Sequence, residues 1–379
     1  MFEPEYKTLR RAYGFDDVSL VPGDVTINPD QVDTTWKLGE HSFSIPFLAA
    51  AMDGVVDPSF AIALHKFGGL AVMNLEGVQC RYDNPDEVLE RIATASREDV
   101  TALMQQIYSA PVKENLIAER IQQIKKAGAV CAVAIAPANT KRLAPLCVEA
   151  GADIIDVAAT VTTARHRSKS VKGLNLKELK EQINVPVIVG NVVSYTASME
   201  LMETGVDAIL VGVGPGAACT SREVIGVGVP QITATMDCAA ARDAYYKSTG
   251  RYVSIITDGG MRTGGDICKA FASGADAVML GSSFAGTKEA PGRGYHWGMA
   301  TPHAALPRGT RVRVGVKNDL EKLLHGPTSR TDGTENLVGA LKLGMSICGA
   351  DHIAEMHEAE IVISPSIKTE GKIYQMIGD

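Results

Sequence analysis

The sequence predicts a single-domain α/β protein folded as a (β/α)8 TIM barrel. Short β-branched runs alternate with helical stretches from residue 45 to residue 283, as parallel βαβ units require. Eight such runs occur, which is the number of strands in this closed barrel. At 379 residues the chain is long enough to bury a large core as one decorated barrel.

Each candidate strand is a short apolar run, and several end in small or polar residues. The eight runs are 45–51, 70–74, 130–137, 153–159, 186–191, 208–214, 254–259 and 277–283. Several are followed by stretches with helical apolar spacing, such as KRLAPLCVEAG and LKELKEQI, and residues 335–350 predict the eighth barrel helix. We expect these helices to form the outer ring, with the chemistry on the rim at the C-terminal ends of the strands.

Residues 80–128 interrupt this rhythm. Two helical stretches, DEVLERIATASRE and KENLIAERIQQIKKAG, lie there between the second and third candidate strands. We interpret the segment as an enlarged βα connection within one domain that spans residues 1–379.

The composition excludes several classes of protein. A formal net charge of −7 disfavours a surface for duplex nucleic acid, which needs many Lys and Arg residues. No apolar run approaches the roughly 18 residues of a membrane span, and the N-terminus lacks the apolar stretch of a signal peptide. The seven cysteines contain no CxxC pair. We therefore expect a soluble, cytoplasmic protein that binds neither nucleic acid nor membrane.

The strongest chemical signal is the loop GVGPGAACTSREVIGVGVPQITA (212–234), which continues directly from a candidate strand. Glycine-rich backbone can turn tightly and let a flat ligand approach closely. Cys219 would stand in this loop on the reactive rim as a candidate nucleophile. The plainer alternative, a small buried hydrophobic residue, is the interpretation that we keep for the other six cysteines. The loop lacks the context of a Rossmann dinucleotide fingerprint.

Two further glycine-rich stretches follow the seventh and eighth strands. TDGGMRTGGD (257–266) and VMLGSSFAG (278–286) fall where barrels of this kind usually bind phosphate, and Asp258 could accept from ribose hydroxyls. Each Gly-Gly pair alone could be a plain tight turn, but two neighbouring loops favour a site. His296 beside Trp297 either lines this site or packs at the rim. The eight histidines show no metal-ligand spacing.

These segments resemble the IMP dehydrogenase/GMP reductase family, and the likeness covers most of the chain. It begins at FDDVSLVPGDV (15–25), continues through residues 45–74 and VIVGNVVS (187–194), and extends to GTKEAPG (286–292). The segments around Cys219 and from TDGGMRTGGD onward are similar to the family's catalytic and phosphate loops, particularly in their dehydrogenase form.

The resemblance implies a role for each matching residue. Cys219 would be the nucleophile that adds to purine C2, with Ser221 at the position of a neighbouring threonine. The implied substrate-binding residues are Met52 and Met299 near the base, Asn191 between nucleotide and cofactor, Asp258 on the ribose, and Gly260, Gly281 and Ser282 on the phosphate. The implied cofactor-binding residues are Asp156, Asn191, Gly212 and Gly214. Main-chain carbonyls of Gly214, Gly216 and Cys219 would hold a potassium ion. The resemblance further implies NAD as cofactor and a homotetramer.

The sequence also departs from the family. Residues 80–128 are too few for the paired regulatory domains of the cystathionine-β-synthase type that many members insert, so we expect no regulatory insert. Ala217 and Val157 replace the family's serines in the cysteine loop and after the cofactor aspartate. After GMAT (298–301), little room is left for the flap that carries an Arg-Tyr pair in the dehydrogenases. Arg308 stands where Gln or Glu normally contacts the purine, and we predict that it assists hydrolysis; phosphate binding, a subunit contact or a solvated strand edge are the alternatives.

Three functions stay open at this point. The first is an IMP dehydrogenase-like enzyme that oxidises IMP to XMP with NAD in guanine nucleotide synthesis. The second is a GMP reductase, which uses the same thiolate with GMP and NADPH. The third is a catalytically idle nucleotide-binding paralogue.

Overall fold

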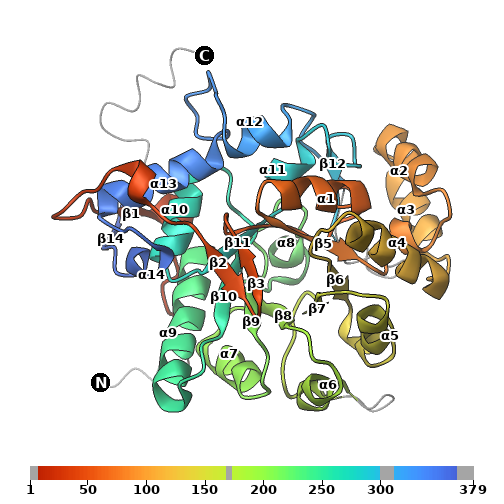
Figure 1. The fold of residues 1–379 in the computed structure, drawn as a ribbon, viewed down its shortest axis with the longest axis horizontal. Helices are drawn as coiled ribbons and strands as arrows, with labels where there is room; N and C mark the ends of the chain where they lie inside the picture. The colour runs from red at the N-terminus through yellow and green to blue at the C-terminus, as the bar shows by residue number, and fades with distance from the viewer. Residues whose placement is uncertain (1–6, 168–172, 299–310, 365–379) are drawn as a thin grey trace.

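The computed structural model describes residues 7–167, 173–298 and 311–364, and its centre is a closed parallel barrel of eight strands (Figure 1). The strands are β4 (Phe47–Ala49), β5 (Leu70–Asn74), β6 (Ala132–Ile135), β7 (Ile154–Ala158), β8 (Val187–Val192), β9 (Ala208–Val211), β10 (Ser254–Asp258) and β11 (Ala277–Leu280). The predicted (β/α)8 barrel is therefore confirmed, and each observed strand lies in or within one residue of a predicted run. These short, almost entirely apolar runs suit strands that are buried on both faces.

An outer helix follows each barrel strand. The eight are α1 (Pro58–Lys66), α4 (Glu114–Lys126), α5 (Pro137–Glu149), α6 (Leu176–Gln182), α7 (Tyr195–Met202), α9 (Gln231–Thr249), α10 (Gly264–Ala272) and α13 (Leu337–Cys348). Side-chain N-caps stabilise the first turns of two of these helices. At α1 the Asp57 carboxylate accepts from the Phe60 N–H at 2.7 Å, and at α10 the Thr263 hydroxyl accepts from the Asp266 N–H at 3.2 Å. The helix predicted at 335–350 is present as α13 and packs on α10.

Three more helical elements fill the long connection between β5 and β6 ahead of α4. They are η3 (Val78–Cys80), α2 (Pro85–Thr94) and α3 (Val100–Tyr108). Figure 1 shows α2 and α3 side by side at the edge of the barrel, near β12 (Tyr295–His296). A separate satellite core forms there from Val78, Val88, Leu89, Ile92, Val100, Met104, Ile107 and Trp297. Helix α3 was not predicted from the sequence.

The remaining elements lie outside the barrel strands and their outer helices. A hairpin of β2 (Trp36–Leu38) and β3 (His41–Phe43) lies at the N-terminal end, where Trp36 Nε1 donates to Ser254 Oγ at 3.3 Å. Strand β1 (Val18–Leu20) pairs with β14 (Ile361–Ile363), and β12 pairs with β13 (Val312–Arg313). The short helices are η1 (Phe15–Asp17), η2 (Pro29–Gln31), α8 (Ser221–Ile225), α11 (Ser282–Ala285), α12 (Leu320–Leu324) and α14 (Ile353–Met356).

None of the helices within the described ranges combines the length and apolar character needed to cross a membrane.

Candidate active site

A cavity of about 380 Å³ opens at the C-terminal ends of the barrel strands. This volume falls in the usual range for small-molecule sites. Residues from the ends of β4 and β6–β11 line it, and so do His296 and Gly298. The cavity therefore gathers the segments that the sequence singled out, on the rim where barrels of this class carry their chemistry.

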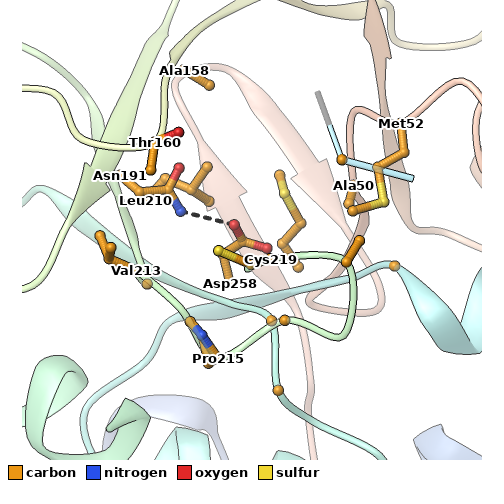
Figure 2. A pocket seen from close by; sticks show the side chains of 18 of the residues that line it. Ala50, Met52, Ala158, Thr160, Asn191, Leu210, Val213, Pro215, Cys219 and Asp258 are labelled. Carbon is orange, nitrogen blue, oxygen red and sulfur yellow. Dashed lines mark hydrogen bonds between the residues drawn. The ribbon is translucent and has the colours of Figure 1, made fainter. Parts of the chain in front are cut away.

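Cys219 lies in the loop between β9 and α8 and faces this cavity (Figure 2). Its backbone N–H donates to the carbonyl of Gly216 at 3.0 Å, which closes a tight turn. Its Sγ lies 3.4 Å from the hydroxyl oxygen of Ser221, within hydrogen-bonding distance for sulfur. The side chain is half-buried. A hydroxyl in this position can exchange a proton with the thiol or stabilise the thiolate.

The other six cysteines have different surroundings. Cys80, Cys131, Cys147, Cys238 and Cys268 are buried, and all seven thiols of the chain are free. Burial raises the pKa of Cys147 and Cys238 to about 12, so these thiols stay protonated near neutral pH. Cys348 is half-buried away from the cavity, and burial also raises its pKa. Cys219 is thus the one cysteine that faces the cavity.

Glycines bring the cysteine loop against the neighbouring strand end. Gly212 has φ +151°, and a Cβ there would lie 2.3 Å from the carbonyl oxygen of Asp258. Gly260 has φ +84° and packs against Pro215 in the same way. Larger residues could not follow this path without displacing the loop, because the contact is with backbone or with a rigid ring.

Asn191 and Asp258 form a polar pair on the inner wall. Asn191 Nδ2 donates to Asp258 Oδ2 at 2.8 Å, and Figure 2 shows this pair beside Cys219. Burial raises the pKa of Asp258 to about 6, while the hydrogen bond from Asn191 acts in the opposite direction. A half-buried carboxylate that faces the cavity can accept hydrogen bonds from ligand hydroxyls.

Asp156 lies on β7, two residues before the end of the strand, and lines the cavity. Its side chain is buried, and neither carboxyl oxygen has a hydrogen-bond partner among the described residues. Burial, with a smaller effect from the nearby Asp258 charge, raises its pKa to about 8. Asp156 is therefore a neutral acid near pH 7, and its unsatisfied oxygens favour a ligand that supplies hydrogen bonds.

The opposite side of the cavity contains the predicted phosphate residues. Gly260, Gly281 and Ser282 all line it, and the thioether of Met52 lies against Gly281, where an added Cβ would be 3.3 Å from Sδ. Ser282 Oγ lies 3.0 Å from Nε2 of His296, a buried residue. Burial lowers the pKa of His296 to about 4, so the imidazole is neutral at pH 7. The sequence left open whether His296 lines the site or packs at the rim, and in the structure it lines the cavity.

Gln231 is a supporting residue that we did not single out from the sequence. Its Nε2 donates to the carbonyls of Val211 at 2.6 Å and Asp258 at 3.1 Å, so it joins the ends of β9 and β10 beneath the cysteine loop. The signal was present in VGVPQITA, where a polar residue follows the proline at the start of a helix. The role itself depends on contacts between distant segments, which local patterns do not show.

Two predicted residues, Met299 and Arg308, lie outside the described residues. Arg311, three residues after Arg308, has a structural role. It donates to the carbonyls of Ile92, Ala93 and Ala95 at the C-terminus of α2, and it stacks 4.4 Å from the ring centre of Tyr295.

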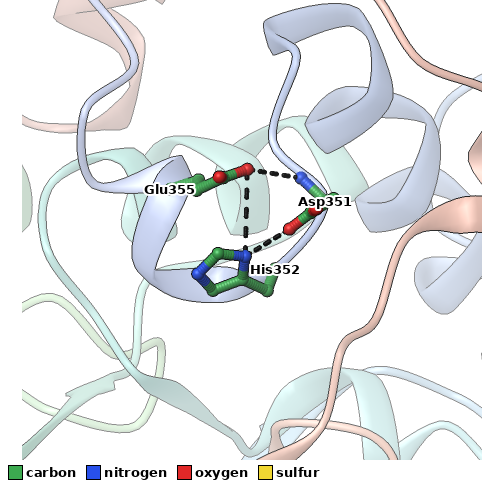
Figure 3. A group of neighbouring side chains, drawn as sticks. All are labelled: Asp351, His352 and Glu355. Carbon is green, nitrogen blue, oxygen red and sulfur yellow. Dashed lines mark hydrogen bonds and ion pairs between the residues drawn. The ribbon is translucent and has the colours of Figure 1, made fainter.

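A cluster of potential metal ligands lies outside the residues that line the cavity. Asp351, His352 and Glu355 are exposed neighbours at the start of α14 (Figure 3). The carboxylate of Asp351 pairs with His352 Nδ1, and Glu355 Oε2 accepts from the Asp351 N–H at 2.9 Å. These contacts explain the cluster as the polar start of a short helix.

Comparison with known proteins gives matches over nearly the whole chain. The family described as "IMP dehydrogenase / GMP reductase domain" matches residues 12–372. An uncharacterized oxidoreductase of Mycolicibacterium smegmatis is 36% identical over 366 residues, covering 94% of this chain and 98% of that protein. The inosine-5′-monophosphate dehydrogenase of Cryptosporidium parvum is 30% identical over 396 residues, covering 92% and 91% respectively. An IMP dehydrogenase/GMP reductase-like protein from Corynebacterium glutamicum, known from its crystal structure, superposes with a TM-score of 0.90 at 36% identity, covering 95% of this chain and 96% of that one.

Proposed function

The chain belongs to the IMP dehydrogenase/GMP reductase family of oxidoreductases, as its motifs predict, and from this premise we propose that Cys219 attacks C2 of a purine 5′-nucleotide. The first candidate reaction is the oxidation of IMP to XMP with NAD, in guanine nucleotide synthesis. The observation that supports it most strongly is the Cys219 thiol at the cavity, 3.4 Å from the Ser221 hydroxyl, while five other thiols are buried.

The proposed reaction has two stages. The Cys219 thiol loses its proton, assisted by Ser221, and the thiolate forms a bond to C2 of IMP. A bound NAD would accept the hydride from C2, and Asp156, Asn191, Gly212 and Gly214 would hold it beside the nucleotide. Water then adds to C2 and the S–C2 bond breaks, which returns the free thiol and gives XMP.

The nucleotide would lie across the mouth of the barrel. Asp258, held by Asn191, would accept from the ribose hydroxyls, while Gly260, Gly281 and Ser282 would bind the 5′-phosphate. His296 is close enough to Ser282 to support the phosphate side. Met52 would pack against the base, and we assign the same role to Met299 from the sequence.

For the cofactor, the unsatisfied carboxyl of Asp156 is the best anchor among the described residues. A ribose hydroxyl would satisfy it. Asn191, Gly212 and Gly214 line the same side of the cavity and would border the nicotinamide. For potassium, the carbonyls of Gly214, Gly216 and Cys219 are hard oxygen donors on a single tight loop, which fits an alkali cation in type.

GMP reductase is the second candidate, and it is favoured by the short segment after GMAT (298–301), which leaves little room for the Arg-Tyr flap of the dehydrogenases. Arg311, near this segment, is bound to α2. In the reductase direction, the thiolate would add to C2 of GMP and the C2 amino group would take up a proton and leave as ammonia. A bound NADPH would supply hydride to C2, and the S–C2 bond would break to give IMP. That sequence needs no water.

Paired assays test the proposal and choose between the two directions. The purified protein is given IMP with NAD, then separately GMP with NADPH, and nicotinamide absorbance is followed. We expect one pair to react in the wild type and neither in Cys219→Ala. Turnover of neither pair would contradict the proposed function and indicate the idle paralogue.

Arg308 has its own test if the IMP reaction is observed. We predict that Arg308→Ala preserves the first burst of hydride transfer and slows XMP release. Equal loss of burst and steady-state rate would assign Arg308 to substrate binding instead.

A further inference from the structure

The satellite core of the α2–α3 connection reaches the cavity through one buried residue, Trp297. Its side chain is 1% exposed and packs among the apolar residues of α2 and α3. Its chain neighbours on both sides, His296 and Gly298, line the cavity. The segment 296–298 is therefore shared by the active-site wall and the satellite core.

A directed chain of hydrogen bonds passes through this contact. Trp297 Nε1 donates to the Tyr108 hydroxyl at 2.5 Å, and that hydroxyl donates to Asp53 Oδ2 at 2.5 Å. The direction of the first bond is fixed because an indole N–H can only donate, and the direction of the second because an ionised carboxylate can only accept. Asp53 Oδ2 also accepts from the Val78 N–H at 2.8 Å. Burial, together with the Asp53 charge, raises the pKa of Tyr108 well above its usual value, so the phenol keeps the proton that it donates.

Asp53 places the other end of this chain beside the active site as well. It directly follows Met52, which lines the cavity. The next residue, Gly54, packs so closely that a Cβ there would lie 2.5 Å from the Tyr295 carbonyl oxygen and 3.1 Å from the Trp297 ring. The Tyr108 hydroxyl thus joins two cavity-lining segments, 50–54 and 295–298.

We propose that Tyr108 is a positioning residue: through Trp297 and Asp53, the α2–α3 connection fixes the wall of the active site formed by Met52, His296 and Gly298. Loss of the hydroxyl leaves a buried indole N–H and a buried carboxylate each short of one partner, which the segments can relieve only by moving. The identity of the nucleotide in the second test below rests on the proposed function, whereas the contact itself does not.

Other contacts show that the same connection holds this region at several points. Arg293, ahead of β12, forms an ion pair with Glu90 of α2 at 2.8 Å. Arg311, ahead of β13, binds the C-terminal carbonyls of α2. Tyr108 differs from these residues because its partners adjoin the cavity lining directly.

The first test compares Tyr108→Phe with Tyr82→Phe by amide hydrogen exchange. Tyr82 is a matched control, because it packs on the same satellite core but its hydroxyl donates to the Ile107 carbonyl at 2.8 Å and not to segment 50–54 or 295–298. We expect Tyr108→Phe to speed exchange in peptides covering 50–56 and 292–298 about tenfold, and Tyr82→Phe to change it less than twofold. Equal exchange of these peptides in both variants would overturn the proposal.

The second test measures IMP affinity by calorimetry and the separate values of kcat and KM. Tyr108→Phe should weaken nucleotide affinity and raise KM about tenfold with a smaller change in kcat, and Tyr82→Phe should leave both near wild type. Trp297→Phe should act in the same direction, and the double variant should be no worse than either single one. If the losses of nucleotide affinity in the two single variants added up in the double variant, Tyr108 and Trp297 would not act through the same hydrogen bond. If the wild type bound neither IMP nor GMP, the proposed function would fail, while the exchange comparison would still decide the role of Tyr108.

Discussion

The two ends of the barrel are built from the same strands but satisfy their polar groups differently. At the N-terminal end, the β2–β3 hairpin packs an aromatic pair, Trp36 and Phe43 with ring centres 5.2 Å apart, and the indole N–H of Trp36 is bonded to Ser254. At the C-terminal rim, both oxygens of Asp156, Oε1 of Gln231 and Nδ1 of His296 have no partner among the described residues. Buried polar groups are normally bonded, so these four unpartnered atoms around the cavity mark the ligand-binding end.

Among substitutions at the two ends of the barrel, we expect the largest effect on turnover from Cys219→Ala at the C-terminal rim. Cys219→Ala should lower turnover by at least about a thousandfold, because the covalent bond to C2 cannot form. Nucleotide binding should persist, since other loops hold the ribose and phosphate. Cys348→Ala is the control and should keep wild-type turnover; similar losses in both variants would contradict a special role for Cys219.

Asp156 should make stability depend on pH. Its folded pKa, about 8, lies above the value of roughly 4 expected when unfolded, so the unfolded state loses this proton first and stability falls as pH rises from about 4 to about 8. Asp156→Asn removes this slope and should raise the free energy of unfolding by on the order of 5 kcal/mol at pH 8 and by about 1 kcal/mol at pH 5. Urea unfolding at both pH values measures it.

The control for Asp156 is Asp24→Asn, which removes an exposed carboxylate. Its unfolding free energy should follow the wild type at both pH values. A gain for Asp156→Asn that is the same at pH 5 and pH 8 would show that Asp156 is not held as a neutral acid.

Asp258→Asn should have a smaller effect, on nucleotide affinity. A hydrogen bond to a charged acceptor contributes about 1.5–3 kcal/mol, which corresponds to a loss of roughly 10- to 100-fold in affinity for IMP or GMP. Calorimetric titration checks it. An affinity unchanged in the variant would remove Asp258 from the ribose site.

Trp36→Phe, at the closed end, should have the smallest effect on function. It removes the bond to Ser254 and part of the packing, so thermal unfolding should shift by an amount equivalent to about 1 kcal/mol. Turnover should stay at the wild-type level. A large loss of activity without unfolding would mean that the two ends are not functionally separate.

Sequence patterns predicted most of the architecture, because parallel barrel strands are short apolar runs that differ sharply from the helices between them. They also placed Cys219, Asn191 and Asp258 at one rim, since the C-terminal ends of parallel strands meet there. Helix α3 was not predicted, because VTALMQQIY follows another helix and no strand separates the two. The Tyr108–Trp297 contact joins residues 189 positions apart, and no local pattern carries that information.

The most direct measurement of the central claim is the mass of the protein quenched during turnover. With IMP and NAD, or with GMP and NADPH, we predict that the working pair yields a protein carrying one purine nucleotide on the peptide that contains Cys219. The adduct should be absent from Cys219→Ala. Rapid turnover by Cys219→Ala, or an adduct on a different residue, would contradict covalent catalysis by Cys219.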